Sequence, residues 1–588
     1  MFYRRDFQWS IARPRRLWAL NEDANQRIDT AFMYYPSIDA MQVRVSLKGL
    51  ADPAAVRAVA LQVRDQATGK VVAGTVMPAV HKDITRLREW RLPPLNGKYD
   101  LLVRLQGTHA QAQVLPFVRY HFPWEHNRLG EADLIVPPFT PIRVRGDTVS
   151  TILRRYTMNG LGLWSQVDAL GRDLLTAPMR IEVRSAGKTF LAHGRMKFTR
   201  VTPTQVVAVA RWSAGPLHGS TRSVWDYDGM MKTTLTLGRT RKTLDWVRLV
   251  VPLVDKRMPL MHAVTDGLRF NYAGKTPPGL GEIWNGNQAR RNHIIGSYVP
   301  YLWVGGPERG VAVFGDNDRG WVDYQAKRPC QELVRKADGT LEMWLNLVAK
   351  PARLTKAHRI VLGFQATPIK PMPKGWRRWT GLGVSGGRGV LFAGSGFYWG
   401  ALTGSGDIYP RKQDFSIYRE LARTRRTRII PTGFIDRWLA GYRAPNPRFA
   451  RGYGPSVRAL FSWITQRPWA VVVYTDPAAM RVDTRVGRTY LNEWGERLYP
   501  TRQYSYGEYL DGYVDPHKSF RDFALWYYDK MLTTFADGIY WDNMYLGDDF
   551  NTVLSDAYRL PDGRIQPATA LWTKRALVRR TGNWACPT

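Results

Sequence analysis

Short runs in which apolar and polar residues alternate fill this chain as far as about residue 365. Residues 41–47 (MQVRVSL) and 99–105 (YDLLVRL) are examples, and Gly, Pro, Asn or Asp residues separate such runs. Alternation with a period of two gives a strand one buried and one solvent-facing side, and regularly spaced short strands are typical of β-sandwiches. The pattern continues in residues 206–210, 233–237 and 248–254. We therefore expect a β-sandwich over residues 1–120 and a larger, supersandwich-like one over residues 121–365.

The rhythm changes after a proline-rich connector at residues 366–375. Beyond it, nearly continuous apolar runs alternate with helix-like stretches, such as residues 415–424 and 520–535. The predicted strands are residues 389–393, 428–434, 470–476 and 538–542. Strands that alternate with helices form a parallel sheet that is buried on both sides. This favours a β/α TIM-like barrel over residues 376–588.

The predicted barrel is incomplete. Four strands can be counted, the fourth ends at Asp542, and 46 residues follow it. Because each further βα unit needs roughly 30 residues, four more units cannot fit. We therefore expect the product of a truncated or frame-shifted gene.

The stretch at residues 536–543 (ADGIYWDN) combines a turn, a short strand and a terminal carboxylate. Side chains alternate along a strand, so Tyr540 and Asp542 are expected on one face. The helix that precedes it carries Ser519-x-x-Asp522, which resembles a capping box. Helix, turn, strand and carboxylate are how a barrel presents a catalytic acid at its C-terminal mouth. The alternative is that Asp542 caps the loop that follows.

Composition excludes a disordered chain. Hydrophobic residues make up 44% and aromatic residues 12%, and 588 residues are enough for three or four domains of roughly 150 residues each. The 23 Trp and 28 Tyr exceed ordinary packing needs. Aromatic faces are common platforms for sugar rings, although sheets also use many aromatic residues.

The net charge of +36 invites a nucleic-acid interpretation, but arginine is scattered along the whole chain. The densest cluster comprises Arg423, Arg425, Arg426 and Arg428 and carries no helix-turn-helix, zinc-finger or RNA-binding signature. We therefore expect no specific nucleic-acid partner. A basic background or an anionic glycan explains the charge equally well.

Metal, cofactor and membrane signals are weak in this sequence. Cys330 and Cys586 lie far apart, which argues against a disulfide framework and a Cys-based zinc site. The glycine-rich residues 394–398 lack the Lys-Ser/Thr of a phosphate-binding loop. We expect no metal, no cofactor and no transmembrane segment. Residues 1–10 do not read as a signal peptide, and a start codon placed too far downstream would give the same appearance.

Several short segments are informative because of the order in which they follow one another along the chain, although none is diagnostic alone. They are residues 122–124 (FPW), 137–141 (PPFTP), 225–232 (WDYDGMMK), 303–310 (WVGGPERG), 365–376, 537–543 and 558–567 (YRLPDGRIQP). Over about residues 120–575 the chain resembles bacterial glycoside-hydrolase-like proteins related to glycoside hydrolase family 123. The resemblance implies N-terminal β-sandwich modules and a C-terminal TIM-barrel-like catalytic domain that acts on glycans.

The resemblance also implies a mechanism. Family 123 enzymes are retaining hexosaminidases in which the 2-acetamido oxygen of the substrate attacks the anomeric carbon. They carry adjacent Asp and Glu after the fourth barrel strand; the Asp orients the acetamido group and the Glu protonates the leaving oxygen. Asp542 matches the first position, whereas Asn543 occupies the second. An amide has no proton to give at a useful pKa, so Asn543 can bind substrate but cannot be the general acid.

Two other carboxylates are candidate proton donors. Asp476 ends the third predicted strand, although Asp before Pro is also a common turn starter. Glu493 lies beside Trp494 in an aromatic insertion between the third and fourth strands. A ring that excludes water raises the pKa of a neighbouring acid, as a general acid requires. The alternative for Glu493 is a solvated loop carboxylate.

The candidate substrate contacts are Tyr540, Asn543, Trp541, Trp494 and Trp399. For the aromatic members the alternative is ordinary packing inside the barrel. The neighbouring pair at residues 548–549, two aspartates, is predicted to be solvated loop.

These observations predict a glycoside hydrolase-like protein, a glycosidase in its full-length form. Its substrate is a poly- or oligosaccharide, with anionic glycans and N-acetylhexosaminides as the classes considered. The alternative is a non-catalytic carbohydrate-binding or scaffold protein whose barrel is degenerate or truncated.

Overall fold

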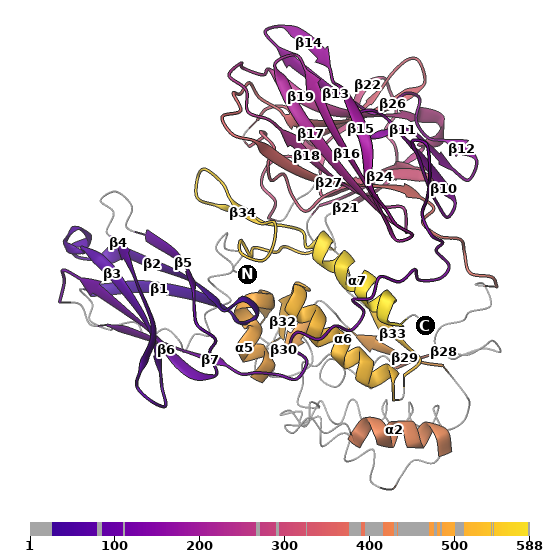
Figure 1. Ribbon diagram of the computed structural model, residues 1–588. Coiled ribbons are helices and arrows are strands. Elements are labelled where there is room, and N and C mark those ends of the chain that lie inside the picture. The colour runs from indigo at the N-terminus through magenta and orange to yellow at the C-terminus, as the bar shows by residue number, and fades with distance from the viewer. Residues whose placement is uncertain are drawn as a thin grey trace. The chain divides into compact units, whose positions relative to one another are not determined.

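The computed structural model consists mostly of β-strands (Figure 1). It describes residues 26–78, 85–109, 112–265, 271–289, 293–324, 326–375, 390–393, 416–427, 432, 470–475, 479–481, 485–499, 511–534, 536–541, 544 and 546–585. The chain divides into two compact units, Met1–Leu129 with Arg377–Met544 and Gly130–Trp376 with Tyr545–Thr588.

The first unit begins with an antiparallel sandwich. Its sheets have the strand orders β1 (Gln26–Tyr35), β2 (Ala40–Leu50), β5 (Thr85–Arg91) and β4 (Val71–Pro78), β3 (Ala58–Asp65), β6 (Gly97–Gln106), β7 (Gln113–Arg119). Val43 and Val45 on β2 share a core with Leu61 and Val63 on β3, and all four are fully buried. The alternating runs at residues 41–47 and 99–105 are therefore strands, as predicted.

The second unit is a larger sandwich. Its nine-stranded sheet has the order β15 (His193–Val201), β16 (Gln205–Ala214), β17 (Leu217–Asp226), β18 (Met231–Leu237), β27 (His358–Thr367), β24 (Gly310–Phe314), β23 (Tyr301–Gly305), β20 (Leu260–Val264), β21 (Asn271–Lys275). Its six-stranded sheet has the order β14 (Lys188–Leu191), β13 (Arg180–Ser185), β19 (Trp246–Val254), β26 (Thr340–Val348), β25 (Gln331–Arg335), β22 (Gly281–Asn285). A five-stranded meander comprises β8 (Arg143–Arg145), β9 (Thr148–Thr151), β10 (Arg154–Met158), β11 (Trp164–Ala169) and β12 (Arg172–Asp173).

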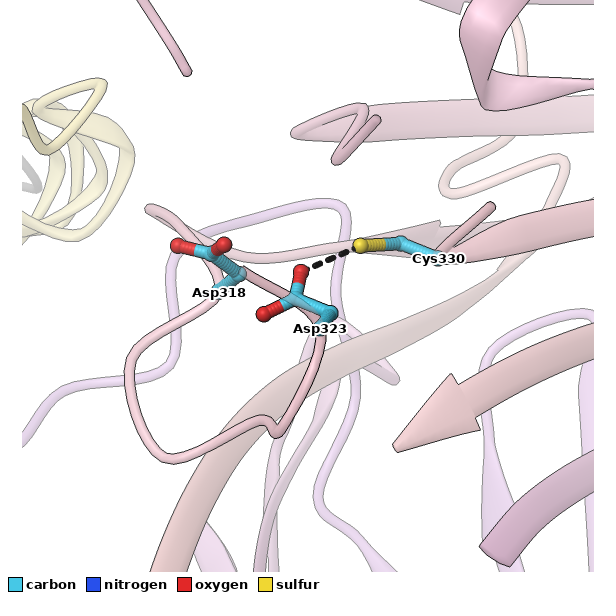
Figure 2. Close-up of side chains that lie close together, drawn as sticks. All are labelled: Asp318, Asp323 and Cys330. Carbon is cyan, nitrogen blue, oxygen red and sulfur yellow. Dashed lines mark hydrogen bonds between the residues drawn. The ribbon is translucent and has the colours of Figure 1, made fainter. Parts of the chain in front are cut away.

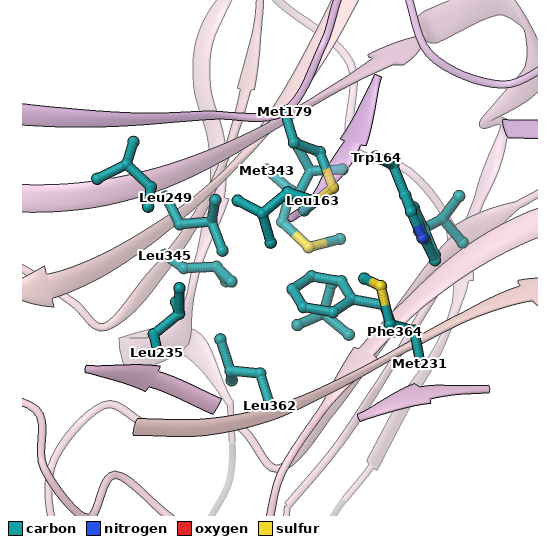
Figure 3. Close-up of a cluster of buried hydrophobic side chains, with 14 of the residues drawn as sticks. Leu163, Trp164, Met179, Met231, Leu235, Leu249, Met343, Leu345, Leu362 and Phe364 are labelled. Atoms are coloured by element: carbon teal, nitrogen blue, oxygen red, sulfur yellow. The ribbon is translucent and has the colours of Figure 1, made fainter. Parts of the chain in front are cut away.

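These two larger sheets enclose one apolar core (Figure 3). Leu235 on β18 and Leu362 on β27 come from the nine-stranded sheet, and Leu249 on β19 and Leu345 on β26 come from the six-stranded sheet. All four side chains are fully buried. Along β18 buried residues alternate with partly exposed polar ones, so the outer face of the nine-stranded sheet is polar.

The rest of the first unit contains a parallel sheet of β28 (Val390–Ala393), β29 (Ala470–Thr475) and β33 (Gly538–Trp541), in that order. Three of the four predicted barrel strands are thereby confirmed. The predicted strand at residues 428–434 lies outside the described residues, except for Thr432 in a turn. The described elements form a three-stranded parallel sheet and not a closed barrel, so the predicted TIM-like barrel is not shown.

The remaining regular elements are short. They are the helices α2 (Ser416–Thr427), α5 (Arg485–Trp494), α6 (Lys518–Leu532) and α7 (Leu571–Ala585), the 3₁₀ turns η1 (Pro36–Ile38), η2 (Pro53–Ala55), η3 (Asp255–Arg257) and η4 (Gly286–Gln288), the antiparallel sheet β30 (Ala479–Arg481), β32 (Asp511–Val514), β31 (Gly495–Tyr499), and the pair β34 (Tyr558–Arg559), β35 (Ile565–Gln566). Helices α2 and α6 confirm the two helical predictions. No helix within the described ranges is long and apolar enough to cross a membrane.

Two local predictions were wrong. The capping residue of α6 is His517, which makes no side-chain capping bond, so Ser519 and Asp522 do not form a capping box. The pair at residues 548–549 is buried and not solvated. Asp548 is hydrogen-bonded to His293, and the backbone of Asp549 forms a bridge with Ala568. In both cases residues distant in sequence supply the partners, which a local pattern does not reveal.

Residues 546–585 pack on the larger sandwich, although the sequence assigns them to a barrel over residues 376–588. The side-chain amide of Asn317 donates to the carbonyls of Asp556 and Pro567, both at 3.0 Å. The amide of Gln566 pairs with the backbone of Ile295 in both directions, at 2.7 and 2.8 Å. These bonds join the segment to the loops at one end of the sandwich.

Candidate functional site

The carboxyl ends of the parallel strands are where the sequence places the active site. In the register of the sheet, Val472 pairs with Gly538 and Thr475 pairs with Trp541, so β29 and β33 end side by side. The next residues in the chain are Asp476 after β29 and, after β33, the pair at residues 542–543. Asp476, Asp542, Asn543 and Trp399 lie outside the described residues.

Strand β33 presents two different faces. Trp541 Nε1 donates a hydrogen bond to the hydroxyl of Tyr528 on α6 at 3.2 Å, and the two rings lie 6.2 Å apart. Tyr540, on the opposite face, is 41% exposed. Helix α6 therefore anchors the Trp541 face of the strand.

Glu493 lies near the end of α5 and not in a loop, and it is 1% exposed. Its Oε2 accepts a hydrogen bond from the backbone N–H of Ser37 at 3.0 Å, and its Oε1 accepts one from the hydroxyl of Ser519. Trp494 Nε1 donates to Ser519 Oγ at 2.7 Å. Burial raises the pKa of Glu493, and the bonds from Ser37 and Ser519 oppose that rise.

Trp494 is at the centre of an aromatic cluster. Its ring stacks on Tyr490 at 4.5 Å and lies 5.6 Å from Trp124, 5.1 Å from Phe520 and 5.2 Å from Phe523. Trp494 and Trp124 are each 1% exposed. These contacts join α5 and α6 to the segment that follows the first sandwich. The placement of Glu493 and Trp494 favours a structural role, and their assigned catalytic and substrate contacts stay predictions.

The Glu493→Gln variant separates these roles. The amide keeps an oxygen for the N–H of Ser37 and a polar group for Ser519, so we expect the free energy of unfolding to change by less than about 1 kcal/mol and activity by no more than a few-fold. Urea unfolding and a glycosidase assay measure the two quantities. A loss of activity of about 100-fold or more would instead identify Glu493 as the general acid.

The segment at residues 225–232 forms a structural joint. Arg154, which is 1% exposed, donates to the carbonyls of Asp228, Ala366 and Ile369 at 2.6–2.9 Å. Gly229 has a φ of 79°, and a Cβ atom there would lie 2.9 Å from Arg154 Nη1. Only glycine fits this turn comfortably, because the left-handed backbone and the guanidinium both oppose a side chain. The joint ties the β17–β18 turn to the proline-rich connector.

An ion-pair network joins the same turn to α7. Arg575 donates to Asp228 Oδ2 and to Asp226 Oδ2, both at 2.7 Å, and Arg579 lies 2.8 Å from Asp226 Oδ1. Burial alone would raise the pKa of Asp228, but the Arg575 guanidinium holds it below its usual value. These ion pairs therefore attach α7 to the β17–β18 turn.

The Arg575→Met variant tests this joint. We expect the free energy of unfolding to fall by about 2 kcal/mol, because Asp228 loses its guanidinium while Asp226 keeps Arg579. Arg155→Met is the matched control, since Arg155 is 66% exposed and lies 3.7 Å from Asp168, a pair expected to contribute less than about 0.5 kcal/mol. If chemical unfolding shows the same loss of unfolding free energy in both variants, the ion pairs of Arg575 do not stabilise this joint.

One group of described residues could hold a metal ion. The ligand atoms of Asp318, Asp323 and Cys330 lie within 4.8 Å of one another, and all three residues are buried. Figure 2 shows the thiol of Cys330 pointing at Asp323, and this bond is 2.5 Å long. Tyr558 and Gln566 donate to Asp318 Oδ1 at 2.8 and 2.9 Å. Thiolate and carboxylates suit Zn²⁺.

Hydrogen bonds within the cluster account for this arrangement as well as a metal ion does. Burial raises the pKa of Asp323 and of the Cys330 thiol, and the thiol donates a hydrogen bond to Asp323 Oδ2. The cluster then serves to attach residues 558–566 to the sandwich. The spacing of Asp318, Asp323 and Cys330 in the sequence matches no metal motif, so no local pattern indicates this cluster. Only the loop between β24 and β25 brings the three together.

Comparison with known proteins gives one family match. The model described as "Glycoside hydrolase 123, third domain" matches residues 142–342, which cover the larger sandwich from β8 into β26. No curated protein matches the chain. Similar solved structures include the GH36 α-galactosidase AgaB from Geobacillus stearothermophilus (8% identity, 84% of this chain and 69% of that chain, TM-score 0.26). Lysyl oxidase PPLO from Pichia pastoris is another (8%, 52% and 68%, TM-score 0.24), and TM-scores this low carry no argument.

Proposed function

This chain is a relative of glycoside hydrolase family 123, and on that premise we propose that it hydrolyses glycosidic bonds in a poly- or oligosaccharide. The match of residues 142–342 to the third domain of that family is the observation that carries the proposal. The candidate carboxylates Asp476 and Asp542 follow β29 and β33 in the sequence and lie outside the matched residues. The chemistry is therefore proposed for the parallel sheet of the first unit.

Asp542 is proposed as the residue that orients the reacting group, and Asp476 as the proton donor. Thr475 and Trp541 are partners at the ends of β29 and β33, and each aspartate is the next residue in the chain. Because neighbouring strands lie about 4.8 Å apart, the paired ends of β29 and β33 are close enough to border one glycosidic bond. This register supports a site built from two strands and not from one Asp-Glu pair.

Substrate contacts are proposed for Tyr540, Asn543 and Trp399. The 41% exposure of Tyr540 supports its role, because a hydroxyl on that face can reach a ligand. Trp541 is proposed to act through its bond to Tyr528, which holds the strand on α6. An N-acetylhexosaminide is the substrate class that the family relation favours.

A second candidate function is carbohydrate binding without catalysis. Asn543 favours it, because the amide stands where family 123 enzymes carry the proton-donating Glu. The full chain should be incubated with aryl glycosides, including N-acetylhexosaminides, and with neutral and anionic polysaccharides, while released sugar and binding are both measured. Turnover supports the first function, and binding without turnover supports the second. If the chain neither binds nor cleaves any of these glycans, both candidate functions are wrong.

A further inference from the structure

A groove with a volume of about 1230 Å³ crosses the outer face of the nine-stranded sheet in the second unit. Five cationic side chains line it: Arg195, Lys197, Arg211, Arg222 and Arg359. All five are exposed. None of the lining residues, which all lie in the described part of the chain, is Asp or Glu. We call this feature the cationic groove.

The strand register arranges these side chains in rows. Arg195 on β15 lies opposite Arg211 on β16, which lies opposite Ser220 on β17. Ser220 lies opposite Thr236 on β18, which lies opposite Arg359 on β27. With strands about 4.8 Å apart, this first row spans about 19 Å. The row is long enough for an extended chain that lies across the strands.

A second row lies two residues along each strand and so on the same face of the sheet. Lys197 is opposite Val209, Val209 is opposite Arg222, and Arg222 is opposite Thr234. The two rows therefore place five cations and three hydroxyl groups on one face of the sheet. A ligand that carries both anionic groups and hydroxyl groups matches this arrangement.

This arrangement of charges destabilises the sheet when no anionic ligand is bound. Like charges directly opposite one another on a sheet destabilise it, and Arg195 faces Arg211. Neither arginine forms an ion pair with any residue in the described ranges. Arg575 on α7, in contrast, pairs with Asp226 at the end of β17 and with Asp228 in the turn that follows. Uncompensated departures from a local rule are expected at functional sites.

The lining residues distinguish a polysaccharide from a single-stranded nucleic acid. Binding of single strands relies on aromatic rings that stack with bases. Trp212 lines the groove but is 3% exposed, and its Nε1 donates to Thr221 at 3.1 Å. Apart from the imidazoles of His193 and His218, no exposed aromatic ring lines it. We propose that the cationic groove binds an anionic polysaccharide through carboxylate or sulfate groups; the choice of a glycan rests on the proposed function.

Binding of the full chain to defined probes tests the proposal. The probes are heparin for sulfate, polygalacturonate for carboxylate, dextran as a neutral glycan and a single-stranded DNA oligonucleotide. The double variant Arg211→Gln with Arg222→Gln removes two groove charges. Arg143→Gln with Arg172→Gln is the matched control, because these exposed arginines belong to the same unit but do not line the groove. Surface substitutions of this kind leave folding nearly unchanged.

We expect heparin or polygalacturonate to bind the wild-type chain, with the dissociation constant raised at least about 10-fold in the groove variant and less than about 2-fold in the control. Equal weakening in both variants, equal affinity for dextran, or no binding of either polyanion would overturn the proposal. Tighter, groove-dependent binding of DNA would overturn it in favour of a nucleic-acid site.

The measurement of binding keeps this proposal separate from the proposed function. A chain that binds a polyanion through the groove but cleaves no glycan retains the groove and loses the enzymatic assignment. A chain that cleaves neutral glycosides and binds no polyanion retains the enzymatic assignment and loses the groove.

Discussion

Replacement of Asp542 by asparagine is expected to lower kcat/KM for the hydrolysed glycan by at least about 100-fold, because preorganised charge at a reacting centre contributes several kcal/mol in the transition state. The strand that precedes it is held between β29 and α6 through Trp541, so the fold should survive the substitution. If Asp542 only caps a loop, the same change should cost about 1 kcal/mol of stability and leave turnover intact. Steady-state kinetics and thermal unfolding of the same preparations separate the two outcomes.

Asp537→Asn is the matched control for this experiment. Asp537 lies in the turn before β33, where Asn supports the same turn chemistry, so its activity should stay near that of the wild type. Activity of Asp542→Asn within a few-fold of the wild type would remove Asp542 from the mechanism.

Asn543→Glu is the informative companion variant. If the site follows the family pattern, the substitution restores the Asp-Glu pair and raises turnover of N-acetylhexosaminides. No gain would place the proton donor elsewhere, with Asp476 the next residue to replace and Glu493 after it.

The pH dependence of stability is expected to carry a large contribution from Asp316. This residue follows β24, is 5% exposed, and accepts a hydrogen bond at Oδ1 from the N–H of Leu571 at the start of α7, 2.7 Å away. Burial, reinforced by the negative charge of Asp556, raises its pKa from 3.8 to about 7. A carboxyl group whose pKa rises on folding stabilises the folded state fully below its unfolded pKa. That contribution is then lost as the pH rises from about 4 to about 7.

Asp316→Asn should abolish this contribution, because the amide stays neutral and still accepts from Leu571. Relative to the wild type, the variant is expected to gain on the order of 3 kcal/mol of stability between pH 4 and pH 8. The difference in unfolding free energy between the two proteins, measured across this range, isolates Asp316 from other titrating groups. Asp338→Asn, at an exposed turn, serves as the control, and a pH-independent difference for Asp316→Asn would contradict the raised pKa.

Local periodicity determined the strands and helices. The alternation at residues 41–47 is found in β2, the run at residues 470–476 contains β29, and the helical spacing at residues 520–535 corresponds to most of α6. These predictions succeed because the spacing of apolar residues among near neighbours in the sequence reflects the side-chain period of a strand or a helix. The same reasoning separated antiparallel sandwiches from a parallel sheet. The sequence also indicated the relation to glycoside hydrolase family 123, and the model of the third domain of that family matches residues 142–342.

Partners far apart in the chain were decided only by the tertiary structure. The sequence predicts Glu493 as a candidate proton donor in an insertion, with a solvated loop carboxylate as the alternative, yet Glu493 lies buried on α5 and accepts a hydrogen bond from the backbone of Ser37. The sequence predicts Ser519 as part of a capping box, yet its hydroxyl donates to Glu493. The sequence does not predict the cationic groove, because its arginines are spread along the whole chain. Arg195 and Arg359 lie in one row only because five strands pair in the observed register. A sequence pattern specifies which side of a strand faces solvent, but not which strand lies beside it. Burial, pKa shifts and charge clusters depend on which strands lie side by side, and the packing of the sheets determines this order.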